Sequence, residues 1–579
     1  MPEYLAPGVY VEETSFRSKS IEGVGTSTAG FVGLTARGPL SSGTTGITPP
    51  LLTGIADFER IYGAANDLRV GSTTVPNYLA HAVRAFFENG GGRLYVARVA
   101  ATGATFATSG GLVSGAGADE QVTLSARFPG GGTMPGTSDV NLRARLQQVE
   151  LVTTKRLAAR QQPGTLVRVG TDYFVLGTTP METTAADATG WTNLADDGAV
   201  SIVTLSVAVD DPTGTTLEYD GLGFHPRHPR YARLVLGGKP PRAADALTNP
   251  IRLTIGDGVN AFELRSALMG AATQRTIELR GGTDGTGAPG IGDYTGALDR
   301  LLALEDVAIV AAPGAAALEG TLPAAVNLAL ITHAETRRAY RIAVLDTPPQ
   351  LEPQGVRDLK SGIDSTYAAL YYPWVIVANP LAAADPSQQS ELALPPSGFV
   401  AGIYARTDIE RGVWKAPANE TVAGALRLQR DVRFGEQEVL NPLGINCIRA
   451  LPNRGIRVWG ARTTSSDPEW KYVNVRRYFI YLEASIDRGT QFAVFEPNGE
   501  RLWANVRNTI TDCLYAEWVS GALLGETPKQ AFFVRCDRTT MTQNDLDNGR
   551  LVCLIGVAVL KPAEFVIFRI GQKTADAQS

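Results

Sequence analysis

The chain carries a strand-like run near each end, and neither run has an obvious partner beside it. Residues Gly8–Glu13 alternate apolar and polar side chains, and Glu564–Ile570 combine β-branched and aromatic residues. A strand that stayed unpaired would leave a row of open backbone N–H and C=O groups, so each run must join a sheet elsewhere. If that sheet belongs to a neighbouring copy, the chain is the subunit of a polymer.

Small polar residues separate the first run from the rest of the chain. The segment Thr14–Thr28 is rich in Ser, Thr and Gly, which is typical of a linker. Fully extended at ~3.3 Å per residue it would reach ~50 Å, similar to the ~50 Å diameter that compactness scaling gives a chain of this length. We therefore expect the first strand to reach beyond its own subunit.

The periodicity of residues 28–99 indicates α/β structure. Pro76 opens a predicted helix with one apolar stripe, the glycines at 90–92 end it, and Arg93–Val99 alternates as a strand. His81 falls opposite the apolar stripe, so we expect it on the solvated face of that helix.

The same α/β periodicity returns after residue 281. Three predicted strands alternate with two predicted helices, at 306–310, 324–338, 341–345, 356–363 and 368–377. This order favours a parallel sheet with right-handed crossovers. We expect residues 28–100 and 281–380 to form one α/β core domain, in which the first segment completes the sheet.

Residues 101–280 interrupt this core and are rich in Gly, Thr, Ser and Ala. Their short alternating runs, separated by turn residues, predict a β-rich inserted region, with strands at 166–169, 173–176 and 251–255. The part from 381 to 555 is mixed, with predicted helices and strands at 473–486, 502–524, 532–534 and 551–555. Gly556 then begins an extended tether that leads to the last strand.

Composition and charge exclude several classes of function. The net charge of −5, without any Lys/Arg cluster interleaved with aromatic residues, argues against a nucleic-acid partner. No secretion signal pattern opens the chain, and the longest apolar run, 551–560, is too short to span a bilayer. We therefore expect a soluble chain made in the cytoplasm, with no direct membrane insertion. The cysteines lack metal-ligand spacing and lie in apolar stretches, which predicts free thiols and no metal site; they are Cys447, Cys513, Cys536 and Cys553.

No motif indicates an active site or a cofactor. The run GTGAPG at 285–290 fits the GxGxxG spacing, but it contains Pro289, and no acidic residue follows at the expected strand end. Four histidines are a small supply for acid–base catalysis. Two alternatives remain open. One is an α/β enzyme or nucleotide-binding protein with Asp346 at a strand end, and the other is a surface adhesin whose insertion binds glycans.

Ten motifs, in order along the chain, are those of one family. The N-terminal part contains PGVYVE (7–12), FERIYG (58–63) and FFENGG (86–91). The C-terminal half contains AALYYPW (368–374), PPSGFVAG (395–402), RGVWKAPA (411–418), LNPLGIN (440–446), VWGART (458–463), WKYVNVRR (470–477) and KPAEFVIFR (561–569). Together they resemble the tail sheath protein of contractile phage tails and related contractile injection systems. The resemblance covers the chain apart from about 101–280.

The resemblance implies a structural role without catalysis or cofactor. A sheath subunit polymerises helically around an inner tube and contracts, when the baseplate triggers it, to drive the tube through a target envelope. The implied partners are other copies of the chain, the inner tube protein, the baseplate, and tail terminator or cap proteins. The implied architecture is α/β and α+β multidomain, with the insertion at 101–280 on the outer surface and a mixed C-terminal domain at 381–555 facing the tube.

The resemblance also implies that arms from neighbouring subunits complete a sheet of the C-terminal domain. The arms are residues 1–27 and 556–579. The implied guest strands comprise Val9, Tyr10, Val11, Glu12, Phe565, Val566, Ile567, Phe568, Arg569 and Ile570. The implied receiving strands comprise Phe532, Phe533, Val534, Leu551, Val552, Cys553 and Leu554. Candidate contacts to the tube are Lys471, Arg476, Arg477 and Arg488.

Overall fold

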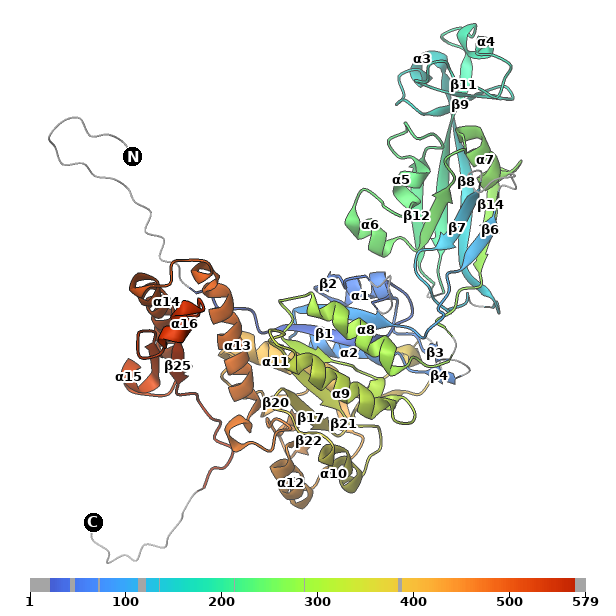
Figure 1. Ribbon diagram of the computed structural model, residues 1–579. Coiled ribbons are helices and arrows are strands. Elements are labelled where there is room, and N and C mark those ends of the chain that lie inside the picture. Colours follow the sequence, from blue (N-terminus) through green and yellow to red (C-terminus); the bar gives the residue numbers. More distant parts are fainter. Residues whose placement is uncertain are drawn as a thin grey trace, which may run out of the picture. The chain divides into compact units, whose positions relative to one another are not determined.

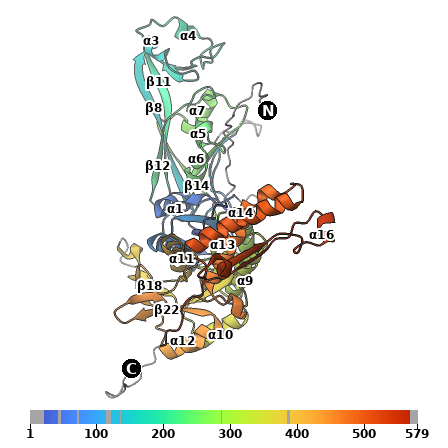
Figure 2. The same ribbon diagram turned by 90° about the vertical axis from the view of Figure 1, so that its left-hand side faces the viewer.

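The computed structural model describes residues 21–41, 47–70, 73–112, 121–134, 136–212, 214–285, 287–383 and 388–567. They fall into two compact units, which Figures 1 and 2 show in two views. The larger, here called the core unit, comprises 27–406 and 417–471. The smaller, the C-terminal unit, comprises the described residues up to 26, 407–416 and those from 472 onward.

A nine-stranded, mostly parallel sheet forms the centre of the core unit. Its order is β2 (Leu51–Leu52), β5 (Arg93–Val99), β1 (Thr28–Leu34), β15 (Ile309–Ala311), β16 (Ile342–Asp346), β17 (Ala368–Tyr372), β22 (Ile445–Leu451), β23 (Gly455–Val458) and β20 (Glu420–Thr421). The strands from β5 to β22 are parallel to one another. This confirms the predicted parallel sheet and the predicted place of residues 28–99 within it.

Helices cover both faces of this sheet. The helices of the core unit outside the insertion are α1 (Ile55–Tyr62), α2 (Tyr78–Glu88), α8 (Ile291–Leu302), α9 (Leu322–Glu335), α10 (Pro353–Ser361), α11 (Ser397–Arg411) and α12 (Phe434–Leu440). Val32 of β1 packs in one cluster with α8 and α9, which lie over the sheet in Figure 1. Phe31, the preceding residue, packs edge-to-face on Phe86 of α2 on the opposite face.

The core sheet extends further along the chain than the predicted limit at residue 380. The strand β22 pairs with β17, so part of the region predicted for the C-terminal domain belongs to the central sheet. The single predicted strand at 368–377 divides into β17 and β18 (Val375–Ala378). The strand β18 joins a separate three-stranded sheet with β19 (Glu391–Leu394) and β21 (Ala425–Leu428).

His81 is buried, and the prediction of a solvated side chain is wrong. It is 3% exposed, and burial lowers its pKa to about 4. The reason is a second layer behind α2. A Cβ on Gly398 of α11 would lie 2.8 Å from Ala82, and one on Gly402 would lie 2.5 Å from the Phe86 carbonyl oxygen. Helix α2 is therefore packed on the sheet on one side and on α11 on the other.

The insertion is β-rich, as its sequence texture predicts. The strands among its described residues are β6 (Thr108–Gly111), β7 (Val122–Ala126), β8 (Val140–Thr154), β9 (Leu166–Val169), β10 (Asp172–Val175), β11 (Ala199–Asp210), β12 (Thr216–Leu222), β13 (Ile251–Ile255) and β14 (Gln274–Arg280). Its helices are α3 (Lys155–Ala158), α4 (Thr189–Thr192), α5 (Ala232–Leu236), α6 (Ala243–Thr248) and α7 (Ala261–Met269). Strands β8 and β11 pair over twelve residues, and α3 and α4 lie near one end of that pair (Figures 1 and 2).

The C-terminal unit is built on two long helices. They are α13 (Val473–Gly489) and α14 (Glu500–Val519), and after them come α15 (Pro528–Ala531), β24 (Phe532–Arg535), α16 (Gln543–Asp547) and β25 (Leu554–Val557). Both helices match predicted ones, with ends that differ by a few residues. Tyr478 and Leu482 of α13 pack with Trp503 and Ile510 of α14 in a single buried cluster. One small hairpin pair, β3 (Leu68–Val70) and β4 (Thr73–Val75), completes the described strands.

Candidate assembly site

The strands β24 and β25 form an isolated antiparallel pair. Phe532 lies opposite Val557, and Arg535 lies opposite Leu554. Within the described part of the chain, neither strand belongs to a larger sheet. Near its end the ladder is extended by one bridge, in which Leu523 pairs with Val559. A two-stranded pair of this kind is marginal in water unless a third strand or a packed face supports it.

The two faces of the pair have different environments. On the inner face, Phe532 and Val534 pack against the cluster of α13 and α14. On the outer face Phe533 is 55% exposed and Leu554 is 49% exposed. The Phe533 ring lies over Gly556, where a Cβ would come within 2.2 Å of it. This pair therefore presents apolar side chains and open strand edges together, which is the chemistry that an added strand requires.

The strand predicted as the second receiving strand differs from its predicted extent. The predicted strand begins at Leu551 and ends before Gly556, whereas β25 begins at Leu554 and includes Gly556. Leu551, Val552 and Cys553 precede the strand and are half-buried against the α13–α14 cluster. Gly556 does not break the strand because the Phe533 ring covers it.

The segment after β25 is held along α13 for part of its length. Asn474 donates a hydrogen bond from Nδ2 to the Leu560 carbonyl oxygen at 3.1 Å, and the Tyr472 hydroxyl donates to Glu564 at 3.1 Å. Beyond that contact three apolar side chains are exposed, Phe565 by 71%, Val566 by 69% and Ile567 by 79%. The other predicted guest residues, Phe568, Arg569, Ile570, Val9, Tyr10, Val11 and Glu12, lie outside the described residues.

The linker that follows the predicted N-terminal arm is attached to its own C-terminal unit. Ile21 is buried against Gly489 of α13, and the Val24 amide donates to the Ser485 hydroxyl at 3.1 Å. A Cβ on Gly23 would lie 2.3 Å from the Tyr481 hydroxyl oxygen, so glycine permits this close approach. The length available between Glu12 and Ile21 is thus ~30 Å when extended, less than the ~50 Å expected from the sequence.

A buried ion pair joins the linker, the end of α11 and α13. Both guanidinium nitrogens of Arg477 donate to the Asp408 carboxylate, at 2.8 and 2.6 Å, and the side chains are 3% and 2% exposed. The Thr26 hydroxyl donates to Asp408 at 2.6 Å, and the Thr26 carbonyl accepts from Arg477 at 3.1 Å. Burial raises the pKa of Asp408, and Arg477 opposes that rise.

The four candidate tube contacts have unequal access to the surface. Arg477 is occupied by the ion pair, and Arg476 is also buried, 5% exposed, with one nitrogen 4.0 Å from Glu483. Lys471 is half-buried in the core unit, and Arg488 is exposed near the end of α13. In the described subunit, Arg488 is therefore the candidate with the most exposed side chain.

Asp346 does not lie in an open cleft. Its carboxylate is 4% exposed and accepts hydrogen bonds from the Ser397 amide at 2.9 Å and the Ser397 hydroxyl at 2.6 Å. Burial raises the pKa of Asp346 to about 7, while the bonds from Ser397 oppose the rise. His333 lies elsewhere, with Nε2 2.8 Å from Arg341. The arrangement ties Asp346, at the end of β16, to the start of α11.

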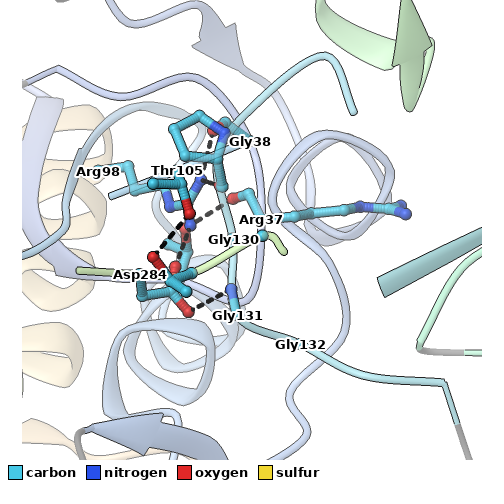
Figure 3. Close-up of polar contacts among 12 residues, drawn as sticks. Arg37, Gly38, Arg98, Thr105, Gly130, Gly131, Gly132 and Asp284 are labelled. Atoms are coloured by element: carbon cyan, nitrogen blue, oxygen red, sulfur yellow. Dashed lines mark hydrogen bonds and ion pairs between the residues drawn. The ribbon is translucent and has the colours of Figure 1, made fainter. Parts of the chain in front are cut away.

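A junction between core and insertion that the sequence did not predict lies around Arg98 and Asp284 (Figure 3). Arg98 of β5, 0% exposed, donates to the Gly38 and Pro129 carbonyls at 2.6 and 2.8 Å and to Asp284 at 2.7 Å. The other Asp284 oxygen accepts from the Gly131 amide at 2.9 Å. A second ion pair, Arg37 with Asp211, lies between the same two regions. The sequence contained one sign of this junction, namely a charged residue at a strand position whose side chain points inward.

The described residues offer no centre for metal chemistry. Among them, no three His, Cys, Asp or Glu side chains gather closely enough to hold a metal ion. No helix in that part of the chain has the length and apolar character needed to cross a membrane.

Solved structures with the same fold belong to one class of assembly. The helical sheath of the anti-feeding prophage in its contracted state matches 99% of this chain and all of its own, with a TM-score of 0.53 at 22% identity. The contracted sheath complex of the extracellular contractile injection system PVC matches 99% of each chain, with a TM-score of 0.51 at 21% identity. The chain therefore shares its fold with these two contractile sheath proteins.

Family models and curated relatives identify the family itself. The phage tail sheath central domain matches residues 287–464, and the phage tail sheath C-terminal domain matches residues 465–573. A putative prophage major tail sheath protein of Pseudomonas aeruginosa is 28% identical over 45% of this chain and 64% of its own length. The tail sheath protein of Enterobacteria phage T4 is 24% identical over 36% of this chain and 30% of its own. The chain belongs to the contractile tail sheath family.

Proposed function

We propose that the chain polymerises helically around an inner tube and contracts when a baseplate triggers it, which drives the tube through a target envelope. The observation that carries this proposal is the β24–β25 pair, which has open edges and an exposed apolar face in a chain of the sheath family. The exposed run Phe565–Ile567 supplies a matching apolar strand. Such a subunit is a component of a phage tail or a phage-tail-like particle, assembled in the cytoplasm.

The joint between subunits is a sheet shared by three chains. The β24–β25 pair receives Val9–Glu12 from one neighbour and Phe565–Ile570 from another. A six-residue strand adds a handful of backbone hydrogen bonds at ~1 kcal/mol net each. Burial of Phe565 and Ile567 adds ~2 kcal/mol each. Both arms leave from segments attached to α13, so the C-terminal unit fixes the origin of each arm.

Contraction in this proposal is a rigid-body rearrangement from an extended to a shorter, wider sheath. The extended state is metastable, and the baseplate releases it, so no fuel, cofactor or active site is needed. The face toward the tube includes Arg488, with Lys471 as a second candidate. Arg476 and Arg477 act within the subunit, where they hold α13. The insertion at 101–280 lies on the outer surface, and the tail terminator or cap binds the last ring.

Negative-stain microscopy of the purified full chain tests the proposal. We expect helical tubes or polysheaths, because each subunit carries both the arms and the pair that receives them. Truncation before Glu564, or deletion of residues 1–13, should leave a folded subunit that forms no tubes. Arg427→Ala, at an exposed residue of the core unit, serves as a control that should still assemble.

Two outcomes would contradict the proposal. One is a full chain that stays monomeric at high concentration, and the other is a truncated chain that unfolds, since the strands would then be intramolecular. The adhesin alternative predicts glycan binding by the full chain that is lost when the insertion is changed. The enzyme alternative predicts a turnover that Asp346→Ala abolishes.

A further inference from the structure

The turn of the receiving pair brings two cysteines opposite each other. The register of β24 and β25, with Arg535 opposite Leu554, continues by one step to Cys536 opposite Cys553. Each thiol also shifts the pKa of the other, as expected for two sulfurs that lie close together. The residues between them include α16, so a bond between the sulfurs would close that whole excursion into a loop.

The ladder fixes the type of position that the two cysteines occupy. The Ala558 amide donates to the Ala531 carbonyl at 2.8 Å, so this opposed pair is hydrogen-bonded. Bonded and non-bonded pairs alternate along an antiparallel ladder, which makes Cys536 and Cys553 a non-bonded pair. In agreement, the Cys536 carbonyl oxygen turns outward and accepts from Arg507 at 3.5 Å. Cα atoms of such pairs lie about 4.5 Å apart, within the range of disulfides.

Both side chains lie on the inner face of the pair. Cys536 is fully buried in the α13–α14 cluster, and Cys553 is half-buried against the same cluster. Among the described residues, no third ligand joins the two sulfurs to make a metal site. Nothing in the described structure crosses between them.

We propose that Cys536 and Cys553 are a redox couple, which exists as two thiols in the reduced subunit and as a cross-strand disulfide after oxidation. The oxidant is a small-molecule disulfide such as oxidised glutathione. The Cys553 thiolate attacks one oxidant sulfur and releases one glutathione thiolate. Cys536 loses its proton to water and attacks the Cys553 sulfur of the mixed disulfide, which releases the second glutathione. Two electrons pass from the cysteines to the oxidant, which becomes two thiols.

The surroundings make this oxidation slow at neutral pH. Burial raises the pKa of Cys553 to about 12, and it also raises the pKa of Cys536. The charged groups nearby are Arg507, which lowers both pKa values, and Asp537, which raises that of Cys536. Because the thiolate is the attacking species, the rate should rise about tenfold for each pH unit below the pKa. Assembly in a reducing compartment therefore leaves the thiols intact.

Peptide mapping of the full chain tests the couple directly. The reduced protein is incubated with oxidised glutathione at pH 7 and pH 9, alkylated, digested without reductant and analysed by mass spectrometry. We expect one intramolecular Cys536–Cys553 peptide, two hydrogens lighter than the reduced pair, and faster formation at pH 9. Cys447 and Cys513 should remain alkylated, which serves as the internal control.

Several outcomes would overturn the couple. They are a stable glutathione adduct on Cys553 beside a free Cys536, a bond between different cysteines, and an intermolecular cross-link. The Cys553→Ser variant should form no disulfide within the protein, and Cys447→Ser should form the same bond as the wild type. The peptide map of the wild-type protein tests the couple without any variant. A Cys536→Ser protein that folds poorly would therefore not weaken the test.

A consequence for assembly rests on the proposed function. The disulfide anchors the turn end of the receiving pair, so amide exchange of β24 and β25 should slow after oxidation, and preformed tubes should resist dissociation better. If exchange slows while no tubes form under any condition, the couple stands and the proposed assembly fails. If tubes form and the disulfide never appears, the proposed assembly stands and the redox couple fails.

Discussion

Gly91 and Gly92 follow each other at the end of α2, yet they meet different surroundings. A Cβ on Gly91 would lie 2.2 Å from the fully buried Phe86 ring, whereas a Cβ on Gly92 would meet nothing within 4 Å. We expect Gly91→Ala to destabilise the core unit by about 1–3 kcal/mol, because the ring cannot move away. Gly92→Ala should change stability by less than about 0.5 kcal/mol. Thermal unfolding of both variants measures the difference, and equal midpoints would contradict the packing around Phe86.

His81 makes the stability of α2 depend on pH. Its pKa is about 4 in the fold and near 6.5 when unfolded, so folding favours the neutral ring. Its contribution is therefore intact above pH 6.5 and is lost as the pH falls toward 4. At pH 5 the loss is about 2 kcal/mol relative to pH 7. Hydrogen exchange of α2 amides should show this loss in the wild type and a smaller one in His81→Leu.

The same pH series carries its own control. His333 also has a lowered pKa, about 3, because of burial and Arg341, so some acid sensitivity should remain in the His81 variant. Identical losses in the wild type and His81→Leu would contradict the buried state of His81.

His81 also shows why the burial of a single side chain is hard to predict from sequence. The apolar stripe of α2 was read correctly, with Leu79, Val83 and Phe86 all buried. A second partner, α11, begins more than 300 residues later at Ser397 and packs on Ala82 and on the Phe86 carbonyl. A pattern within eleven residues records the first packing partner of a helix and contains no information about the second.

At the scale of elements, the Arg477–Asp408 pair holds three segments together. Arg477→Ala would leave a carboxylate that is 2% exposed without its cation, so we expect a loss of about 3–5 kcal/mol in the C-terminal unit. The control is Arg427→Ala, which breaks the exposed pair of Arg427 with Glu391 and should cost about 0–1 kcal/mol. Urea unfolding followed by Trp fluorescence measures both. Similar losses in the two variants would contradict the buried pair.

Strands in which apolar and polar residues alternate could be predicted from the sequence. The division of one apolar run between two different sheets could not. The strands β9 and β13 match the predicted runs residue for residue, because turn residues bound them on both sides. The run Ala368–Val377 is apolar, and only Pro373, which falls between β17 and β18, indicates a break; nothing in the run shows that β18 joins a different sheet. In the receiving pair the strand β24 was correct, whereas the extent of β25 depended on the Phe533 ring over Gly556.

At the scale of the whole chain, the Arg98–Asp284 pair of the core holds the insertion in place, because Arg98 also donates to the Pro129 carbonyl and Asp284 accepts from the Gly131 amide. Asp284→Ala should cost about 2–4 kcal/mol, since Arg98 is fully buried and Asp284 is partly exposed. The double variant Arg98→Met with Asp284→Ala should recover part of that loss, because the unpaired cation is gone. Calorimetry of the two single variants and the double variant gives the coupling energy. Purely additive losses would contradict a direct interaction.

Contacts between residues far apart in the sequence explain why some features of the whole chain could not be predicted from it. The parallel sheet could be predicted from local order, but Arg98 and Asp284 are 186 positions apart, and nothing local connects them. The predicted core limit at residue 380 was too early for the same reason, since β22 returns to β17 after an excursion of about seventy residues. The predicted arms follow from unpaired end strands, and their guest residues remain predictions.

The position of β1 between β5 and β15 sets an order of events during synthesis. The first neighbour, β5, leaves the ribosome soon after β1, whereas β15 follows only when the insertion has been made. At translation rates of roughly 5–20 residues per second, the ~180 residues of the insertion take ~10–40 s. Throughout that time the apolar strand Thr28–Leu34 has one free edge in a crowded cell. The insertion thus imposes a waiting period during which that edge is open to pairing with another chain.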